Sequence, residues 1–209
     1  YLEYPPFLNM MGDTAFRLNK LDVALKYYRL YVNLEPAGPE ADVILTRIGD
    51  IYVQQKEKGA ARAMYKEASE RFPDKDGGLV AKMRMAEEGI YDEPSVSGMF
   101  SIFDNRPTVA PPDVYREIID KHPDSSLVPL AQLKLAMWYL WNKNYMKTLE
   151  ACTEFIKKYP NHELAPKVRE TALKTFAALA AQGKNEGSYT QMHEAWERFP
   201  LVRDKGEML

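Results

Sequence analysis

The chain has 209 residues, of which 45% are apolar and 28% charged, and its formal net charge is −2. This composition is typical of a soluble globular protein, and the weak negative charge argues against general nucleic-acid binding, which needs a basic field. No apolar run reaches the roughly 18 residues that indicate a membrane helix, so no membrane span is predicted.

The sequence does not determine the cellular compartment of the protein. Cys152 is the only cysteine in the sequence, so an intrachain disulfide is impossible and cysteine usage does not indicate a redox environment. The chain begins Tyr1-Leu2-Glu3, without an initiator methionine or a signal peptide. We therefore expect an excised or processed piece of a longer protein, whose targeting segment would be missing.

Helical periodicity dominates the first part of the chain. Leu8, Met11 and Ala15 fall at helical spacing and predict a first helix. Asn19-Lys20 is interpreted as a turn, and Asp76-Gly77-Gly78 as a break between two helices. The helices expected in this part are 7–19, 21–34, 40–55, 58–72 and 79–91.

The pattern is interrupted at 92–111. Its prolines and glycine exclude one continuous helix, and it is too long for an ordinary helix–helix connection. Because residues 99–103 are apolar, we expect the interruption to be ordered. It would either patch the outer surface, which we favour, or occupy the binding groove as an internal pseudo-ligand. A short helix at 113–121 then resumes the pattern.

The stretch 130–160 shows the pattern most clearly. Its first helix is apolar on two faces and must be covered on two sides, and a turn at 142–144 leads into a second amphipathic helix. Tyr159 precedes Pro160 and is biased out of the helical region, so the second helix ends there. A further pair follows, with helices at 164–181 and 188–199 joined across 183–187. Residues 201–209 carry too little pattern to place.

The same unit recurs along the chain. A proline ends each helix pair, at 36, 73, 123, 160 and 200, with intervals of 37, 50, 37 and 40 residues. A small residue that close helix crossing needs recurs in the first helix, at Gly12, Gly49, Ala86 and Ala136. One antiparallel pair leaves an apolar outer face, and stacking a further pair on it buries that face.

Further positions repeat with the same spacing. In the first repeat they are Ala15, Ala24, Tyr28 and Pro36. In the second repeat they are Tyr52, Ala61, Tyr65, Ala68 and Pro73. In the fourth repeat they are Tyr139, Cys152, Phe155 and Pro160, with Thr148 where alanine is expected. With these residues, about 7–200 of the chain resembles the tetratricopeptide repeat family. Its spacing is 37 residues where the family has about 34, which lengthens the turn between repeats.

The resemblance implies an all-α fold, a right-handed α-solenoid of about five helix pairs. We expect one tetratricopeptide-like solenoid over 1–209, with repeats at about 7–36, 40–73, 78–123 (carrying the insert 92–111), 127–160 and 163–200. Residues 113–166 look like the subfamily found in bacterial cell-envelope proteins, which includes the outer-membrane barrel-assembly lipoproteins and the Tol-associated periplasmic coordinator. Asp124, Asn161 and the residues after them carry that likeness.

No constellation for catalysis is visible in the sequence. His162-Glu163-Leu164-Ala165-Pro166 starts like a zinc-protease motif but lacks the second histidine, and no P-loop, GxSxG or GxGxxG occurs. Cys152 is interpreted as a packed thiol, with a functional thiol as the alternative. We therefore expect no enzyme, no metal and no cofactor.

Partner binding is the expectation instead. In the family the first helices line the concave face, and the residues implied there are Thr46, Arg47, Asp50, Met83, Arg84, Glu87, Met137 and Trp141. Met137 and Trp141 could instead pack on the fifth repeat.

The expected function is a non-catalytic protein–protein interaction scaffold that binds a peptide or protein partner on its concave face. We expect it in a bacterial cell-envelope assembly, with a periplasmic location favoured over a cytoplasmic one. The alternative is a structural spacer within a longer tetratricopeptide protein, with no ligand of its own. The sequence does not identify the partner.

Overall fold

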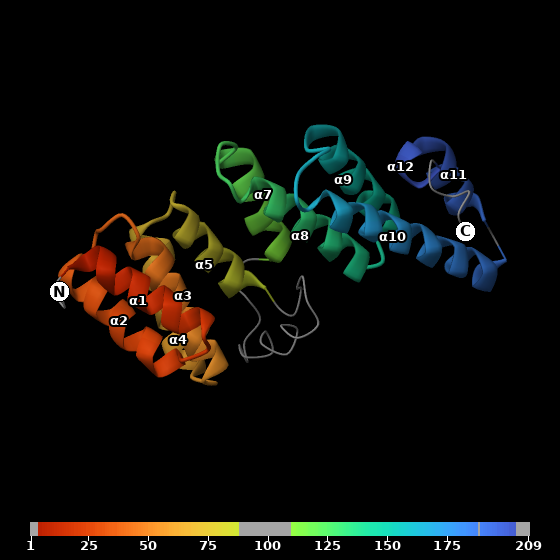
Figure 1. Cartoon of the computed structure of the whole chain (residues 1–209). Coiled ribbons are helices and arrows are strands. Elements are labelled where there is room, and N and C mark those ends of the chain that lie inside the picture. The colour runs from red at the N-terminus through yellow and green to blue at the C-terminus, as the bar shows by residue number, and fades with distance from the viewer. Residues whose placement is uncertain (1–3, 88–109, 188, 204–209) are drawn as a thin grey trace. The chain divides into compact units, whose positions relative to one another are not determined.

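The computed structural model describes residues 4–87, 110–187 and 189–203, which form helices and their connections with no strand among them (Figure 1). The all-α prediction is confirmed. Two compact units divide the chain: unit 1 holds α1 to α5 and unit 2 holds α7 to α12. None of the helices in these ranges is long and apolar enough to cross a membrane.

Unit 1 is built from antiparallel helix pairs. Its helices are α1 (Pro5–Arg17), α2 (Leu21–Leu34), α3 (Ala41–Gln54), α4 (Lys58–Arg71) and α5 (Asp76–Ala86). Helices α1 and α2 form one pair and α3 and α4 the next, while α3 also contacts α2 before it and α5 after it. One continuous core runs through these helices, with fully buried Tyr28, Ile44 and Tyr65 among its members.

Unit 2 repeats the arrangement. Its helices are α7 (Pro111–Lys121), α8 (Val128–Trp141), α9 (Tyr145–Lys158), α10 (Ala165–Glu186), α11 (Thr190–Arg198) and α12 (Pro200–Arg203). Helices α8 and α9 form a pair, α7 packs on α8, and α10 packs on α9 (Figure 1). The core includes Leu149, Cys152 and Phe155 of α9 together with Val168 and Ala172 of α10.

The turns within three helix pairs share the same backbone conformation. Asn19, Lys56 and Lys143 have φ of 56°, 64° and 56°, so each occupies the left-handed region. The next residue donates its backbone N–H to the carbonyl five residues earlier, with N–O distances of 2.8 Å for Lys20, Glu57 and Asn144. This is the Schellman ending of an α-helix, and it reverses the chain within a few residues.

The predicted break at Asp76-Gly77-Gly78 is wrong. Both glycines lie inside the first turn of α5 and are buried, because α5 begins at Asp76. The backbone N–H of Gly77 donates to Asp42 Oδ2 at 2.9 Å, and a Cβ atom on Gly77 would overlap the backbone of Asp42. Gly77 therefore allows α5 to approach α3 closely, and Gly78 allows it to approach the backbone at the end of α4, where a Cβ atom would overlap the carbonyl oxygen of Phe72.

The predicted turn at 183–187 is also wrong. Helix α10 continues through Gly183, which is buried, and ends at Gly187 with a φ of 67°. The short helix α12, which had no predictive pattern, packs on α10 and α11. The predicted insert 92–111 lies outside the described residues up to 109, and Pro111 already belongs to α7.

Candidate partner-binding surfaces

A three-residue network joins neighbouring helix pairs of unit 1. The hydroxyl of Tyr28 on α2 donates to Asp13 Oδ1 on α1 at 2.7 Å, and the Arg47 guanidinium on α3 pairs with the same oxygen. In this way a second helix, its own first helix and the following first helix meet at one carboxylate.

The same network recurs 37 residues later along the chain. Tyr65 donates to Asp50 Oδ1 at 2.6 Å, and Arg84 Nε on α5 lies 3.3 Å from the same oxygen. The two networks are therefore a structural repeat, and each ties one helix pair to the next.

A glycine lies beneath each tyrosine ring of these networks. An ideal Cβ atom at Gly12 would lie 2.5 Å from two ring carbons of Tyr28, and one at Gly49 would lie 2.5 Å from Cε1 of Tyr65. These distances are shorter than van der Waals contact, so the missing side chain is what lets the ring lie against the helix. The expectation that the small residues mark close helix crossings fits this geometry.

Burial sets the protonation of the two hydroxyls. Desolvation raises the pKa of Tyr28 and of Tyr65, and the adjacent carboxylates of Asp13 and Asp50 raise it further. The phenols are therefore hydrogen-bond donors at neutral and moderately alkaline pH.

Several predicted binding residues of unit 1 are not on the surface. Thr46, Met83 and Glu87 are 4%, 2% and 0% exposed. The hydroxyl of Thr46 lies 2.8 Å from the carbonyl oxygen of Gly77, so it packs α3 against α5. Glu87 Oε2 lies 3.7 Å from Arg84 Nη1. Thr46 and Glu87 thus make contacts within unit 1, and Met83 is buried.

Arg47, Asp50 and Arg84 are the predicted residues of unit 1 that remain accessible. Their side chains are 32%, 25% and 30% exposed, and all three belong to the two networks described above. The structure therefore brings Asp50 and Arg84 together as one ion pair, whereas Arg47 pairs with Asp13.

Unit 2 fills the corresponding positions with uncharged residues. In the repeat register, 87 residues after Asp50 and Tyr65, Met137 and Cys152 stand in their places, and Thr171 stands in place of Arg84. Cys152 is 0% exposed and burial raises its pKa to about 12, as a packed thiol requires. Ala136 takes the place of Gly49, because no ring needs the space.

Trp141 is the most exposed large apolar side chain described in either unit, at 70%. It ends α8, where the register places the polar residues Arg17 and Gln54 in unit 1. Met137 and Trp138 are half-buried on the same helix, and Met137 packs partly on the core that includes α10. Met137 therefore packs in part on the fifth helix pair, as the alternative interpretation expected, whereas Trp141 does not.

Tyr139, two residues before Trp141, contacts the helices on both sides of α8. Tyr139 accepts a hydrogen bond from Arg116 of α7 at 2.7 Å, and the ammonium of Lys147 on α9 lies 5.7 Å from its ring centre. Arg29 and Tyr52 form the equivalent pair in unit 1. The sequence analysis missed these arginines, although their shared position 23 residues before a tyrosine was a usable signal.

Metal-binding groups and surface hollows are the remaining features of the described residues that bear on small ligands. No group of three or more His, Cys, Asp or Glu side chains that could hold a metal ion occurs within the described ranges. One hollow lies between α10 and α11, lined by Leu179, Gly183, Glu186 and Met192, and another lies at the α1–α2 turn. Neither hollow contains any of the predicted binding residues.

Comparison with known proteins bears on the repeats. Models of the tetratricopeptide repeat match residues 5–37, 43–75 and 130–162. Each of these three stretches therefore matches a tetratricopeptide repeat. The matched stretches are the pairs α1/α2, α3/α4 and α8/α9, which are the pairs that share the register described above. No curated protein matches the chain.

A solved structure supports the same fold. The crystal structure of a protein named MamA matches with a TM-score of 0.56 at 13% sequence identity, covering 97% of this chain and 92% of that one. At this identity the likeness shows a shared tetratricopeptide-type solenoid fold and nothing about shared partners.

Proposed function

We propose that this protein is a non-catalytic interaction scaffold that binds a peptide or protein partner through its first helices, with the end of α8 as the main contact. The observation that carries the proposal is the 70% exposure of Trp141 beside the half-buried Met137 and Trp138. Tryptophan dominates binding energy at many protein interfaces, and methionine adapts to varied partners. Tetratricopeptide repeats supply the extended surface that such binding uses.

The charged residues of unit 1 take a secondary part in this proposal. Arg47 already pairs with Asp13 and Arg84 with Asp50, so a partner gains little by displacing those pairs. They would contribute polar contacts at the rim and help to select the partner's orientation. Of the expected binding residues, Arg47, Asp50 and Arg84 in unit 1 and Met137 and Trp141 in unit 2 are the ones whose side chains are not buried.

We further propose that the partner belongs to a bacterial cell-envelope assembly, with a periplasmic location. This rests on the likeness of residues 113–166 to cell-envelope repeats, including Asp124 and Asn161 after the prolines. Fractionation of the native organism tests it, since recovery with cytoplasmic markers would contradict the location.

One observation favours the second candidate, a spacer within a longer protein. Asp13 pairs with Arg47 and Asp50 with Arg84, so these first-helix charges are used in contacts within unit 1. A spacer would need no exposed aromatic residue, however, and Trp141 is the feature that distinguishes the two functions.

Affinity capture from the native organism with the whole chain tests the proposal. We expect a partner that is retained by the parent and by Gln54→Ala but lost with Trp141→Ala. Gln54 is the matched control, because it is exposed at the register position of Trp141 in unit 1. Equal retention by both variants would contradict the proposed site, and no specific partner at all would favour the spacer.

A further inference from the structure

The first helices of the two units differ in charge. In unit 1, α1, α3 and α5 carry four basic and four acidic residues. In unit 2, α8 and α10 carry five basic residues and two acidic ones: Lys134, Lys167, Arg169, Lys174 and Lys184, with Glu170 and Glu186. No acidic residue occurs in the sequence from 125 to 149, which contains all of α8. The first helices of unit 2 are therefore positive, although the formal net charge of the chain is −2.

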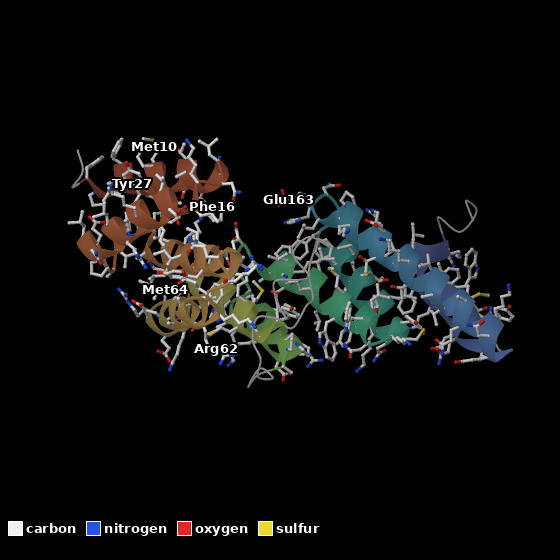
Figure 2. All side chains as sticks on the ribbon, turned by 90° about the horizontal axis from the view of Figure 1, so that it is seen from below. Met10, Phe16, Tyr27, Arg62, Met64 and Glu163 are labelled. Atoms are coloured by element: carbon white, nitrogen blue, oxygen red, sulfur yellow. The ribbon has the colours of Figure 1, made fainter. Side chains whose placement is uncertain are left out.

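One of these basic residues lies next to the level of the exposed tryptophan. Helices α8 and α10 lie side by side in unit 2 (Figure 2). The 37-residue register places Lys174 of α10 level with Met137, and Ala178 level with Trp141. Because Ala178 is small, α10 has no large side chain beside Trp141 at that level. Lys174 lies one helical turn away, so a ligand that contacts Trp141 also comes within reach of an ammonium group.

One carboxylate of α10 is shared by two lysines. Glu170 Oε1 lies 2.5 Å from Lys174 Nζ, and Glu170 Oε2 lies 3.5 Å from Lys167 Nζ. The hydrogen bond from Lys174 is the largest cause that lowers the pKa of Glu170, and the charge of Lys167 adds to it. Two ammonium groups thus face a single carboxylate, which leaves one positive charge uncompensated. The side chains of Lys174, Lys167 and Glu170 are 65%, 41% and 47% exposed, so a partner can reach them.

We propose that Trp141, Lys167 and Lys174 bind an acidic segment of the partner protein, in which an apolar side chain contacts Trp141 and side-chain carboxylates pair with the two lysines. The inference rests on the proposed scaffold function and names the chemistry of the ligand at that site. The argument is charge complementarity, because the uncompensated ammonium groups beside the tryptophan attract an acidic segment and repel a basic one.

The register also gives the spacing within that segment. The levels of Trp141 and Lys174 differ by about 6 Å along the helices, and neighbouring axes are roughly 8–10 Å apart, so the diagonal is about 11 Å. An extended chain advances about 3.3 Å per residue, which places the first carboxylate roughly three residues from the apolar side chain. Lys167 lies about 10 Å further back along α10, so a second carboxylate follows roughly three residues later. A free C-terminus is not needed.

Other anionic ligands match this surface less well. Nucleic acids and anionic membranes are bound through extended basic fields that contact several phosphates. Here two lysines share one carboxylate, and the chain as a whole has a negative formal charge. A protein segment with a few carboxylates is the ligand whose charge corresponds to that of the surface.

The test uses a short fluorescent peptide, acetylated and C-terminally amidated, with one tryptophan and two glutamates at the spacing given above on a glycine–serine background. We expect saturable anisotropy binding to the whole chain at low salt. The same peptide with glutamines in place of the glutamates should bind roughly fivefold more weakly, because two exposed ion pairs are lost. Glu170→Gln should bind the acidic peptide roughly threefold more tightly, because both lysines lose their competing carboxylate.

Charge reversals at two places separate a defined site from general attraction. Lys174→Glu should weaken binding of the acidic peptide roughly tenfold, because an attraction becomes a repulsion. Lys26→Glu is the matched control, since Lys26 is exposed on α2 of unit 1 and its reversal changes the net charge equally. It should leave binding nearly unchanged. Trp141→Ala should weaken binding of the acidic and the glutamine peptides alike.

Several results would overturn the inference. Absent binding of the acidic peptide would do so, and so would binding unaffected by Lys174→Glu in a variant with the parent's circular dichroism spectrum. Equal binding of the acidic and glutamine peptides, lost in both cases with Trp141→Ala, would refute the acidic ligand and leave the scaffold function standing. Native partner capture that Trp141→Ala leaves intact would instead refute the proposed function at α8.

Other occupants of the surface give distinct outcomes, each of which would also overturn the inference. A dimer in sedimentation that Lys174→Glu dissolves would assign the surface to a second copy of the chain. Peptide binding that appears only after deletion of 95–108 would assign it to that segment of the same chain. Cosedimentation with phosphatidylserine-containing vesicles, without peptide binding, would assign it to a membrane.

Discussion

The α3/α4 pair of unit 1 and the α8/α9 pair of unit 2 occupy the same repeat register with opposite chemistry. In unit 1, Tyr65 lies on Gly49 and its hydroxyl binds Asp50. In unit 2, Cys152, Ala136 and Met137 take those three places. One helical frame thus accepts either a large polar ring over a glycine or a small thiol beside an alanine.

The consequence differs at the surface. Unit 1 commits its first-helix charges to contacts between its own helices, whereas the equivalent helix of unit 2 carries Met137 and the exposed Trp141. A residue that is needed to join repeats is less available to a partner. The comparison therefore predicts that unit 1 is more sensitive to substitution in stability and that unit 2 is more sensitive in binding.

The largest expected effect comes from removing the unit 1 ring. Tyr65→Cys gives α4 the residue of α9 and leaves a cavity over Gly49, because the backbone cannot close the gap. We expect a loss of about 3–5 kcal/mol in the free energy of unfolding, the range of large-to-small core substitutions. Urea unfolding followed by circular dichroism measures it, and a loss under about 1 kcal/mol would show that the site collapses freely.

Adding bulk beneath the ring should cost somewhat less. Gly49→Leu places a side chain where even a Cβ atom would meet Tyr65, and overpacking of this kind costs about 1–3 kcal/mol. Ala136→Leu should cost a similar amount in unit 2, because Ala136 is 1% exposed in its core. Either variant unfolding at the parent's urea midpoint would show that the repeat register is misassigned at that position.

The polar link should contribute a smaller amount. Asp50→Asn keeps the shape but removes the charge that Tyr65 and Arg84 share, and we expect a loss of about 0.5–1.5 kcal/mol. Because the Arg84 and Asp50 side chains are 30% and 25% exposed, part of the loss should vanish in high salt. Met137→Leu is the matched control in unit 2, and equal losses in both variants would remove the proposed difference.

The reactivity of the Cys152 thiol measures how tightly the core of unit 2 is packed. Burial raises the pKa of Cys152 to about 12, so the thiol stays protonated below that pH and almost no thiolate exists at pH 8. We expect no reaction with Ellman's reagent in the native protein and full reaction in urea. Rapid native labelling at pH 8 would favour the functional-thiol alternative.

The smallest effect concerns the turns. Lys56 and Lys143 occupy the left-handed region at a cost of about 1 kcal/mol, which glycine avoids. Each substitution to glycine should therefore stabilise by a few tenths to about 1 kcal/mol, with similar values in the two units. A destabilising result would show that the lysine side chain has a role that its backbone does not indicate.

Much of the architecture could be predicted because helical periodicity and the recurring prolines are local signals. The pairs α1/α2, α3/α4 and α8/α9 follow from them, and so do the small residues at Gly12 and Gly49. The role of Gly77 could not be predicted, since a glycine that breaks a helix and one that lets two helices touch look alike in sequence. The predicted turn at Gly183 was wrong because a glycine inside a helix and one that ends a helix also look alike in sequence.

The candidate site was only partly predictable. First-helix positions could be assigned from the register, but the register does not report burial, so Thr46, Met83 and Glu87 were included although they face neighbouring helices. The networks of Asp13 and Asp50 join residues up to 34 positions apart, and their geometry appears only in the folded chain. Trp141 could be predicted because a tryptophan stands on a first helix at a position outside the family's core set.

Site-specific photo-crosslinking tests the central claim, that the end of α8 binds a partner, most directly. A photoreactive amino acid would replace Trp141 in one chain and Gln54 in another, and each would be irradiated in the native organism. The account predicts a discrete protein adduct from position 141 and none from position 54. Adducts of equal yield from both positions, or none from position 141, would contradict it.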